Sequence, residues 1–168
     1  MKIKKIAFPQ NSLLIGTSYD YTDSYCGNLN AGHIITSDEV GKAFFSSSPK
    51  WIGILLMLRN KLVSIFGLKT GDSSKKIHNY RFEKGDRIGL FKVFDKNIDE
   101  LLLGEDDKHL DFRVSLLLEP QSQHKRLIIS TTVIFNNWFG KLYFLPVKQF
   151  HKLIVRNMLK QTLKELKH

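Results

Sequence analysis

The chain has 168 residues, a formal net charge of +10 at pH 7, 42% hydrophobic residues and 25% charged residues. This length suits one domain with one core, and the composition is that of a folded globular protein, which excludes a disordered chain. The single cysteine, Cys26, excludes an internal disulfide framework and a zinc site made of several thiolates. A lone cysteine also favours a reducing, cytoplasmic location.

The N-terminal residues 1–10 begin with a basic stretch, but Pro9 and Gln10 interrupt the apolar run that a secretory leader needs. We therefore expect no signal peptide. The most apolar run, residues 51–58, is far shorter than the ~20 residues of a membrane span, so we expect no transmembrane segment. The positive charge is spread along the chain without a nucleic-acid-binding motif, which argues against nucleic acid as the partner.

The first elements predicted in chain order are one strand and two short helices. Residues 19–26 are aromatic and β-branched enough for the strand. Ser37 is the expected N-cap of the first helix, which should end near Phe45. Residues 49–66 keep the apolar spacing of a second helix, and the polar residues 70–76 that follow predict a loop.

The middle of the chain changes to a β pattern. Four strands are expected, at Ile88–Phe94, Ile98–Leu103, Lys108–Leu118 and Lys125–Phe135. Because the connections between them are short, the strands should form an antiparallel meander.

The strand at residues 108–118 alternates between two kinds of side chain. Its apolar positions are Leu110, Phe112, Val114, Leu116 and Leu118. Its polar positions are His109, Asp111, Arg113 and Ser115. Since side chains alternate across a strand with period two, one face should pack in the core while the other carries the groups suited to chemistry.

Residues 139–166 have the apolar spacing of a long helix, with Phe150 among the residues expected in the core. Pro146 should either kink this helix or mark its start. An antiparallel sheet that curls around the long helix would bury the apolar stripe and leave a cavity between sheet and helix. We therefore expect an α+β fold in which residues 1–168 form a single domain.

Several segments carry a resemblance to a known family. They are Trp51, Leu58–Val63, Phe66–Lys69, Leu103–Ser115, Gly140–Phe144 and Phe150–Val155. Through them the chain resembles the bacterial domain-of-unknown-function family 2867, which is similar to the START-like, or SRPBCC, helix-grip superfamily. The resemblance covers most of residues 15–165, and two positions depart from it, Leu90 and Gln149, where relatives often carry proline.

The resemblance implies a START-like helix-grip domain with a cavity for a hydrophobic ligand. It also implies an oxidoreductase partner, because similar domains occur fused behind short-chain-dehydrogenase-like, nucleotide-binding domains. This chain lacks the Gly-x-Gly-x-x-Gly fingerprint of such a domain.

The candidate ligand-binding residues are a polar strip and two residues across from it. Arg113 would bind a ligand carboxylate and His109 would transfer a proton, with Asp111 beside them. Tyr143 and His151 of the long helix would face them across the cavity. The alternative is a solvated outer face on which Asp111 and Arg113 simply pair.

Three functions are compatible with these features. The first is non-enzymatic binding of a small hydrophobic or amphipathic ligand. The second is an enzyme of the cyclase or proton-transfer type that uses His109 with Asp111. The third is an interaction module for a short-chain-dehydrogenase-like partner. We expect no cofactor and no metal, because the acidic turn at residues 105–107 lacks the spacing of a calcium loop.

A basic row follows the long helix at every fourth residue. It consists of Lys148, Lys152, Arg156, Lys160 and Lys164. This row is either a solvated outer face or a surface that binds anionic lipid head groups.

Overall fold

The structure, a computed structural model, describes residues 2–29, 34–47, 81–121 and 124–167. The helix expected at residues 49–66 and the loop at 70–76 lie outside the described residues. The described strands are β1 (Lys4–Lys5), β2 (Tyr21–Leu29), β3 (Arg87–Ile88), β4 (Phe91–Lys96), β5 (Glu100–Asp106), β6 (Leu110–Pro120) and β7 (Lys125–Phe135). The described helices are α1 (Ser37–Ser46) and α3 (Trp138–Glu165).

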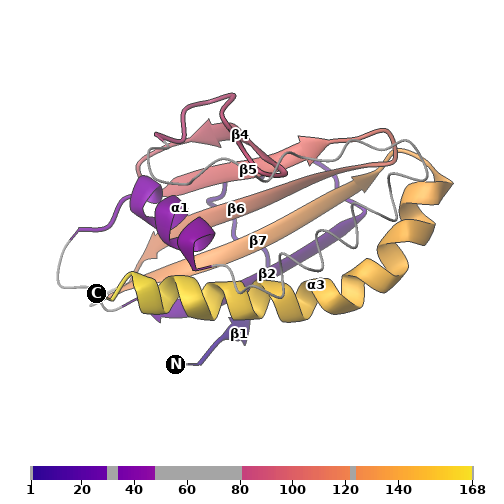
Figure 1. Ribbon diagram of the computed structural model, residues 1–168. Coiled ribbons are helices and arrows are strands. Elements are labelled where there is room, and N and C mark those ends of the chain that lie inside the picture. The colour runs from indigo at the N-terminus through magenta and orange to yellow at the C-terminus, as the bar shows by residue number, and fades with distance from the viewer. Residues whose placement is uncertain (1, 30–33, 48–80, 122–123, 168) are drawn as a thin grey trace.

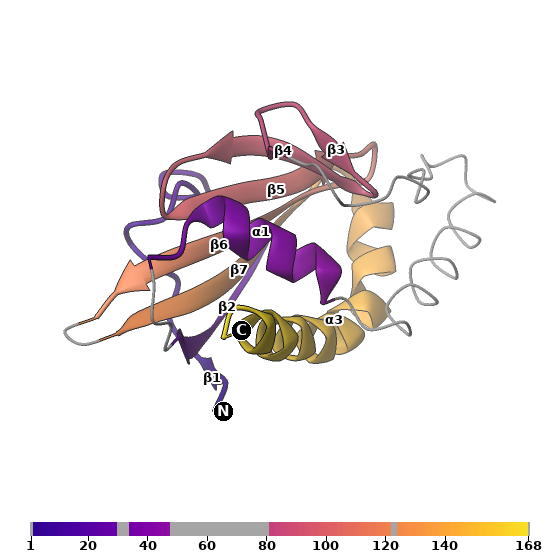
Figure 2. The same cartoon turned by 60° about the vertical axis from the view of Figure 1, so that its left-hand side comes forward.

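The strands form one sheet in the order β1-β2-β7-β6-β5-β4-β3 (Figure 1). Every neighbouring pair is antiparallel, as the short connections predict. Both described helices lie on the same face of this sheet, with α3 running along β2 and β7 and α1 packed beside it (Figures 1 and 2). The fold is therefore α+β, with an antiparallel sheet and a long C-terminal helix.

The core lies between the sheet and the two helices. On β6 it takes Val114, Leu116 and Leu118, which confirms that the apolar face of this strand packs. On α3 it takes Val155 and Leu159. The side of the sheet that carries these residues is called the helix side below, and the opposite side is called the outer side.

The boundaries of several elements differ from those expected. Strand β7 has the predicted bounds, whereas the strand expected at 88–94 is divided into β3 and β4 at Gly89. Gly89 has φ +60°, a left-handed conformation that allows the tight turn between the two strands. Helix α1 is capped by Thr36 rather than Ser37, because Thr36 and Glu39 form a reciprocal capping box.

Helix α3 continues through Pro146 instead of starting there. Figure 1 shows that the helix changes direction part-way along, as the missing hydrogen bond and the ring clash of an internal proline predict. Phe150 is 58% exposed, so its assignment to the core is wrong. None of the described helices is long and apolar enough to cross a membrane.

The outer side of the sheet is covered in part by the N-terminal segment, residues 6–20. Glu100 of β5 anchors this segment, although its side chain is buried and only 1% of the residue is exposed. Its carboxylate accepts hydrogen bonds from Ser12 Oγ at 2.6 Å, Leu13 N at 2.8 Å and Ser115 Oγ at 2.5 Å. Three donors compensate the loss of hydration that burial imposes on a carboxylate.

Candidate functional site

The structure does not bring the five predicted site residues together. Asp111 and Arg113 lie on the outer side of the sheet, because they alternate with Val114 and its apolar neighbours. His109 lies in the turn that connects β5 to β6. Tyr143 and His151 are half-buried on α3, on the helix side. The polar strip therefore does not face Tyr143 and His151.

His109 is bound to the first turn of α3. Its Nδ1 lies 2.9 Å from Asn137 Nδ2 and 3.1 Å from Asn137 Oδ1, and its ring contacts Phe139 at 4.7 Å between centroids. Asn137 is the N-cap of α3 and accepts a hydrogen bond from Gly140 N. His109 thus connects the β5–β6 turn to the start of α3, which is a structural role.

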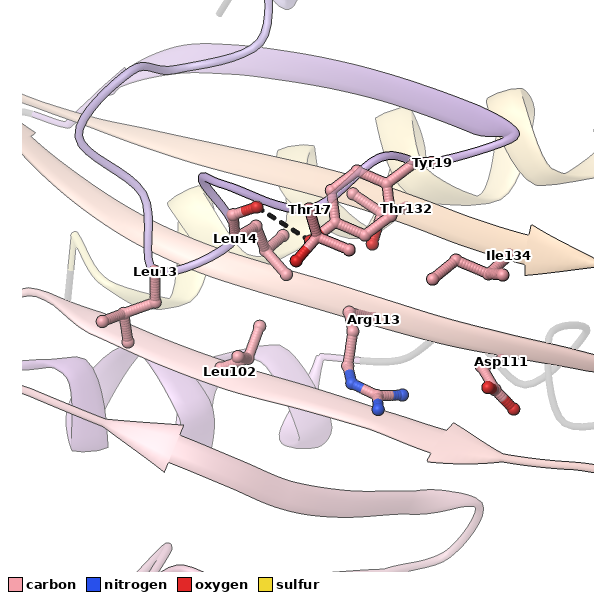
Figure 3. A pocket seen from close by; sticks show the side chains of 9 residues that line it. All are labelled: Leu13, Leu14, Thr17, Tyr19, Leu102, Asp111, Arg113, Thr132 and Ile134. Atoms are coloured by element: carbon pink, nitrogen blue, oxygen red, sulfur yellow. Dashed lines mark hydrogen bonds between the residues drawn. The ribbon is translucent and has the colours of Figure 1, made fainter.

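A pocket of about 230 Å³ lies on the outer side between the N-terminal segment and strands β5 to β7 (Figure 3). The polar side chains of its lining are Thr17, Tyr19, Asp111, Arg113 and Thr132. This volume is below the roughly 300–1,000 Å³ of ordinary ligand sites. The pocket has room for a small group only.

The guanidinium of Arg113 is already engaged. It donates to Asp106 Oδ1 at 2.6 Å and lies 3.5 Å above the centre of the Phe94 ring. Asp111 instead accepts from Asp107 N and from Asn136 Nδ2, both at 3.0 Å. Within the described residues, Arg113 therefore pairs with Asp106 rather than with Asp111. These contacts are those of a structural surface network.

A second cluster of titratable groups lies on the helix side, where β2 meets α3. Asp23 of β2 is buried, with 4% of the residue exposed. The Tyr21 hydroxyl donates to Asp23 Oδ2 at 2.6 Å, and His151 Nε2 of α3 lies 3.5 Å from Asp23 Oδ1. We call these three residues the Asp23 cluster. Tyr21 and His151 are each partly buried, whereas Asp23 Oδ1 and His151 Nε2 are buried atoms.

The electrostatics of the Asp23 cluster keep its carboxylate ionised. Burial, the largest influence, raises the pKa of Asp23, but His151, the Tyr21 hydroxyl and Lys5 together outweigh it and hold the pKa below its ordinary value of 3.8. Burial and the adjacent Asp23 raise the pKa of Tyr21 far above its ordinary value. The hydroxyl therefore stays protonated, as its hydrogen bond to Asp23 requires.

Three buried polar atoms of this region have no hydrogen-bond partner among the residues that the structure describes. They are Asp23 Oδ1, His151 Nε2 and Thr131 Oγ1. Thr131 of β7 stands opposite Asp23 in the β2–β7 register, so its side chain is on the same side of the sheet. At 3.5 Å the His151–Asp23 contact is an ion pair when His151 is protonated, and it is longer than a hydrogen bond between charged groups. Each unpaired atom retains capacity for one more polar contact.

The sequence matches the family described as Protein of unknown function (DUF2867) over residues 15–158. The chain belongs to this family. No curated protein matches the sequence. Among solved structures, the crystal structure of TTHA0849 from Thermus thermophilus is similar with a TM-score of 0.40 and 10% identity, covering 87% of this chain and 97% of that one.

In this DUF2867 protein no sequence pattern pointed to Asp23. Asp23 lies in the polar segment Thr22–Ser24, and a single aspartate in such a segment is normally exposed to solvent. It is buried here because β2 pairs with β7 and α3 packs over β2. The one available hint was His151, whose position on α3 favours an orientation towards the sheet. Among the described residues, no three His, Cys, Asp or Glu side chains come close enough to share a metal ion.

Proposed function

We propose that this protein binds a small amphipathic ligand on the helix side of the sheet, with the polar end of the ligand at the Asp23 cluster. We also infer that the α+β fold is of the helix-grip type, in which such ligands lie between sheet and C-terminal helix. The observation that carries the proposal is a buried, ionised carboxylate whose Oδ1 has only the long 3.5 Å contact with His151 Nε2, next to the unpaired hydroxyl of Thr131. Buried polar atoms are almost always paired, so unpaired ones indicate a place for a ligand group or water.

The surroundings of the Asp23 cluster suit an amphipathic molecule. The Tyr21 ring packs edge-on against Phe144 at 4.8 Å between centroids, and Val133, which is 2% exposed, stands opposite Tyr21 on β7. Apolar side chains therefore border the polar atoms, as in most small-molecule sites.

The negative charge of Asp23 determines which polar group the ligand must carry. An ionised carboxylate only accepts hydrogen bonds, so the ligand must present a donor, such as a hydroxyl or an amine. A carboxylate ligand would meet the negative charge of Asp23 and be repelled. This differs from the sequence-based hypothesis, in which Arg113 would bind an acidic ligand, because Arg113 lies on the outer side and is engaged by Asp106.

Calorimetric titration with octanol and with octanoate tests the proposal. We expect octanol to bind at least about tenfold more tightly than octanoate, because a hydrogen bond to a charged group contributes about 1.5–3 kcal/mol. Asp23→Asn should weaken octanol binding about tenfold or more. Asp111→Asn, the same change on the outer side, should leave it unaltered. Equal binding of both compounds, or equal effects of both substitutions, would contradict the proposal.

Acid–base catalysis at the same cluster is the second candidate. A carboxylate 3.5 Å from a histidine Nε2 is positioned to orient the imidazole. The His109–Asp111 pair is a weaker candidate, since Asn137 and Asn136 respectively engage its members. A co-purified molecule, detected by native mass spectrometry, that exchanges a carbon-bound proton for deuterium in the presence of the protein would favour the enzyme. A molecule that stays unchanged would favour simple binding.

A short-chain-dehydrogenase-like partner stays a prediction that rests on the family resemblance. Co-purification of an oxidoreductase with the gently isolated protein would support it.

A further inference from the structure

The side of α3 that faces away from the sheet carries large apolar residues. They are Trp138, Leu142, Leu145, Phe150 and Leu153, and each is between 54% and 73% exposed. The first three and Leu153 follow the spacing i, i+4, i+7 and i+15, which puts them on one side of a helix, and Phe150 is next to them. Soluble proteins seldom expose so many large apolar side chains on a single element. We call this surface the α3 outer patch.

Basic residues border the α3 outer patch. Along α3 they are Lys141, Lys148, Lys152, Arg156, Lys160 and Lys164, all of them exposed. The helix has a single acidic residue, Glu165, in its last turn. By helical spacing, Lys141 and Lys152 lie along one edge of the patch, while Arg156 and Lys160 extend it towards the C-terminus. The side of α3 that faces away from the sheet is therefore apolar in its N-terminal half, where the patch lies, and cationic in its C-terminal half and along one edge of the patch.

We propose that the α3 outer patch docks the protein on an anionic lipid surface, with α3 parallel to the membrane plane. Exposed Trp, Phe and Leu would enter the boundary between head groups and acyl chains, while the Lys and Arg side chains contact anionic head groups. Trp138, the most exposed of the apolar residues at 73%, suits the interface because its ring is apolar and its N–H is polar.

Charge complementarity decides between this occupant and a second copy of the chain. A two-fold dimer through the α3 outer patch would bring two basic helices together, each with only Glu165 to offset its cations. The whole chain also carries +10, so the net charge opposes the association of two copies. An anionic lipid surface satisfies the apolar and the basic parts of the patch simultaneously.

Vesicle sedimentation with the full chain tests this proposal. The probes are vesicles of phosphatidylcholine alone and vesicles with equal parts of phosphatidylcholine and phosphatidylglycerol. We expect the protein to sediment with the anionic vesicles, and the bound fraction to fall as salt is added, because exposed charges are screened. Leu145→Glu should weaken partitioning into anionic vesicles by about tenfold or more, since it removes apolar area and adds a repelled charge.

Ile98→Glu is the matched control, because Ile98 is an exposed apolar residue at 72%, in the turn between β4 and β5, and the substitution changes the net charge equally. It should reduce binding far less than Leu145→Glu. Absence of binding to anionic vesicles would overturn the proposal. Equal loss in both variants would overturn it too, because attraction would then follow net charge alone. A wild-type dimer that Leu145→Glu dissociates would assign the patch to self-association instead.

Discussion

Asp23 is a charged residue at a position where the neighbouring strands supply core side chains. In the β2–β7–β6–β5 register it stands in one row with Thr131, Val114 and Leu103. Val114 and Leu103 belong to the hydrophobic core, whereas Asp23 and Thr131 introduce polar atoms at its margin. A buried carboxylate seldom improves stability over an apolar residue of similar size, so its presence favours a role in binding or chemistry.

The pH dependence of stability tests the ionisation of Asp23. Because the folded-state pKa lies below the ordinary value of 3.8, the unfolded chain binds more protons in acid than the folded chain does. The stabilisation from Asp23 is therefore fully present above pH ~4 and is lost as the pH falls through the folded-state pKa. In chemical denaturation between neutral pH and pH ~3, Asp23→Asn should lose less free energy of unfolding than the wild type. Identical pH profiles would show that Asp23 is not stabilised as an anion.

At the scale of elements, Gly140 sets how closely α3 approaches the sheet. A Cβ on Gly140 would overlap the carbonyl oxygen of His109, which already accepts a hydrogen bond from Asn136 N. The start of α3 and the β5–β6 turn are therefore in backbone contact at this point.

Gly140→Ala should destabilise the protein. Alanine is favoured over glycine inside a helix by about 1 kcal/mol, but overpacking against a backbone oxygen costs about 1–3 kcal/mol and the backbone cannot move aside as a flexible side chain would. We expect a net loss of about 1–2 kcal/mol in the free energy of unfolding, measured by urea denaturation. Leu142→Ala, an exposed position in the same turn, should change it far less. A Gly140→Ala variant that is more stable than the wild type would show that the backbone at His109 moves aside to admit the methyl group.

The sequence predicts some elements well because their signals are local. Strand β7 has the predicted bounds because Lys125–Phe135 is rich in β-branched residues, and α1 lies where the acidic first turn of Asp38 and Glu39 predicts a helix, although its N-cap is Thr36. In α3 the assignment of Phe150 to the core is wrong: the buried residues Phe144, Val155 and Leu159 keep one helical spacing through Pro146, and Phe150 lies off that stripe. Phe150 comes one residue before His151, which faces Asp23 on the sheet, so its side chain is rotated towards the exposed side of the helix.

The candidate site could not be predicted for a different reason. The alternation of side chains along β6 correctly predicts that Arg113 and Asp111 share one face of the sheet. Which of the two faces α3 covers depends on the packing of the helices and cannot be read from that alternation. The Asp23–His151 contact joins β2 to α3, and it exists only after both have packed. The spacing of residues within one strand or one helix therefore does not predict a contact between Asp23 and His151.

At the scale of the whole molecule, the two sides of the sheet have different polar networks. On the outer side, Glu100 binds the N-terminal segment and Arg113 binds Asp106, so both charged groups are engaged, while Thr132 Oγ1 in the pocket has no hydrogen-bond partner among the described residues. On the helix side, the Asp23 cluster has unpaired atoms next to apolar walls. We therefore assign a structural role to the outer side and propose ligand binding on the helix side.

Mapping an octanol titration by backbone and side-chain NMR tests this assignment most directly. We predict that the largest shift changes occur at Tyr21, Asp23, Thr131 and His151, and that they disappear in Asp23→Asn. The resonances of Asp111, Arg113 and Thr132 should stay unchanged, since they lie on the opposite side of the sheet. Changes centred on Arg113 and Thr132, with the Asp23 cluster unaffected, would contradict the assignment and place the ligand in the outer pocket.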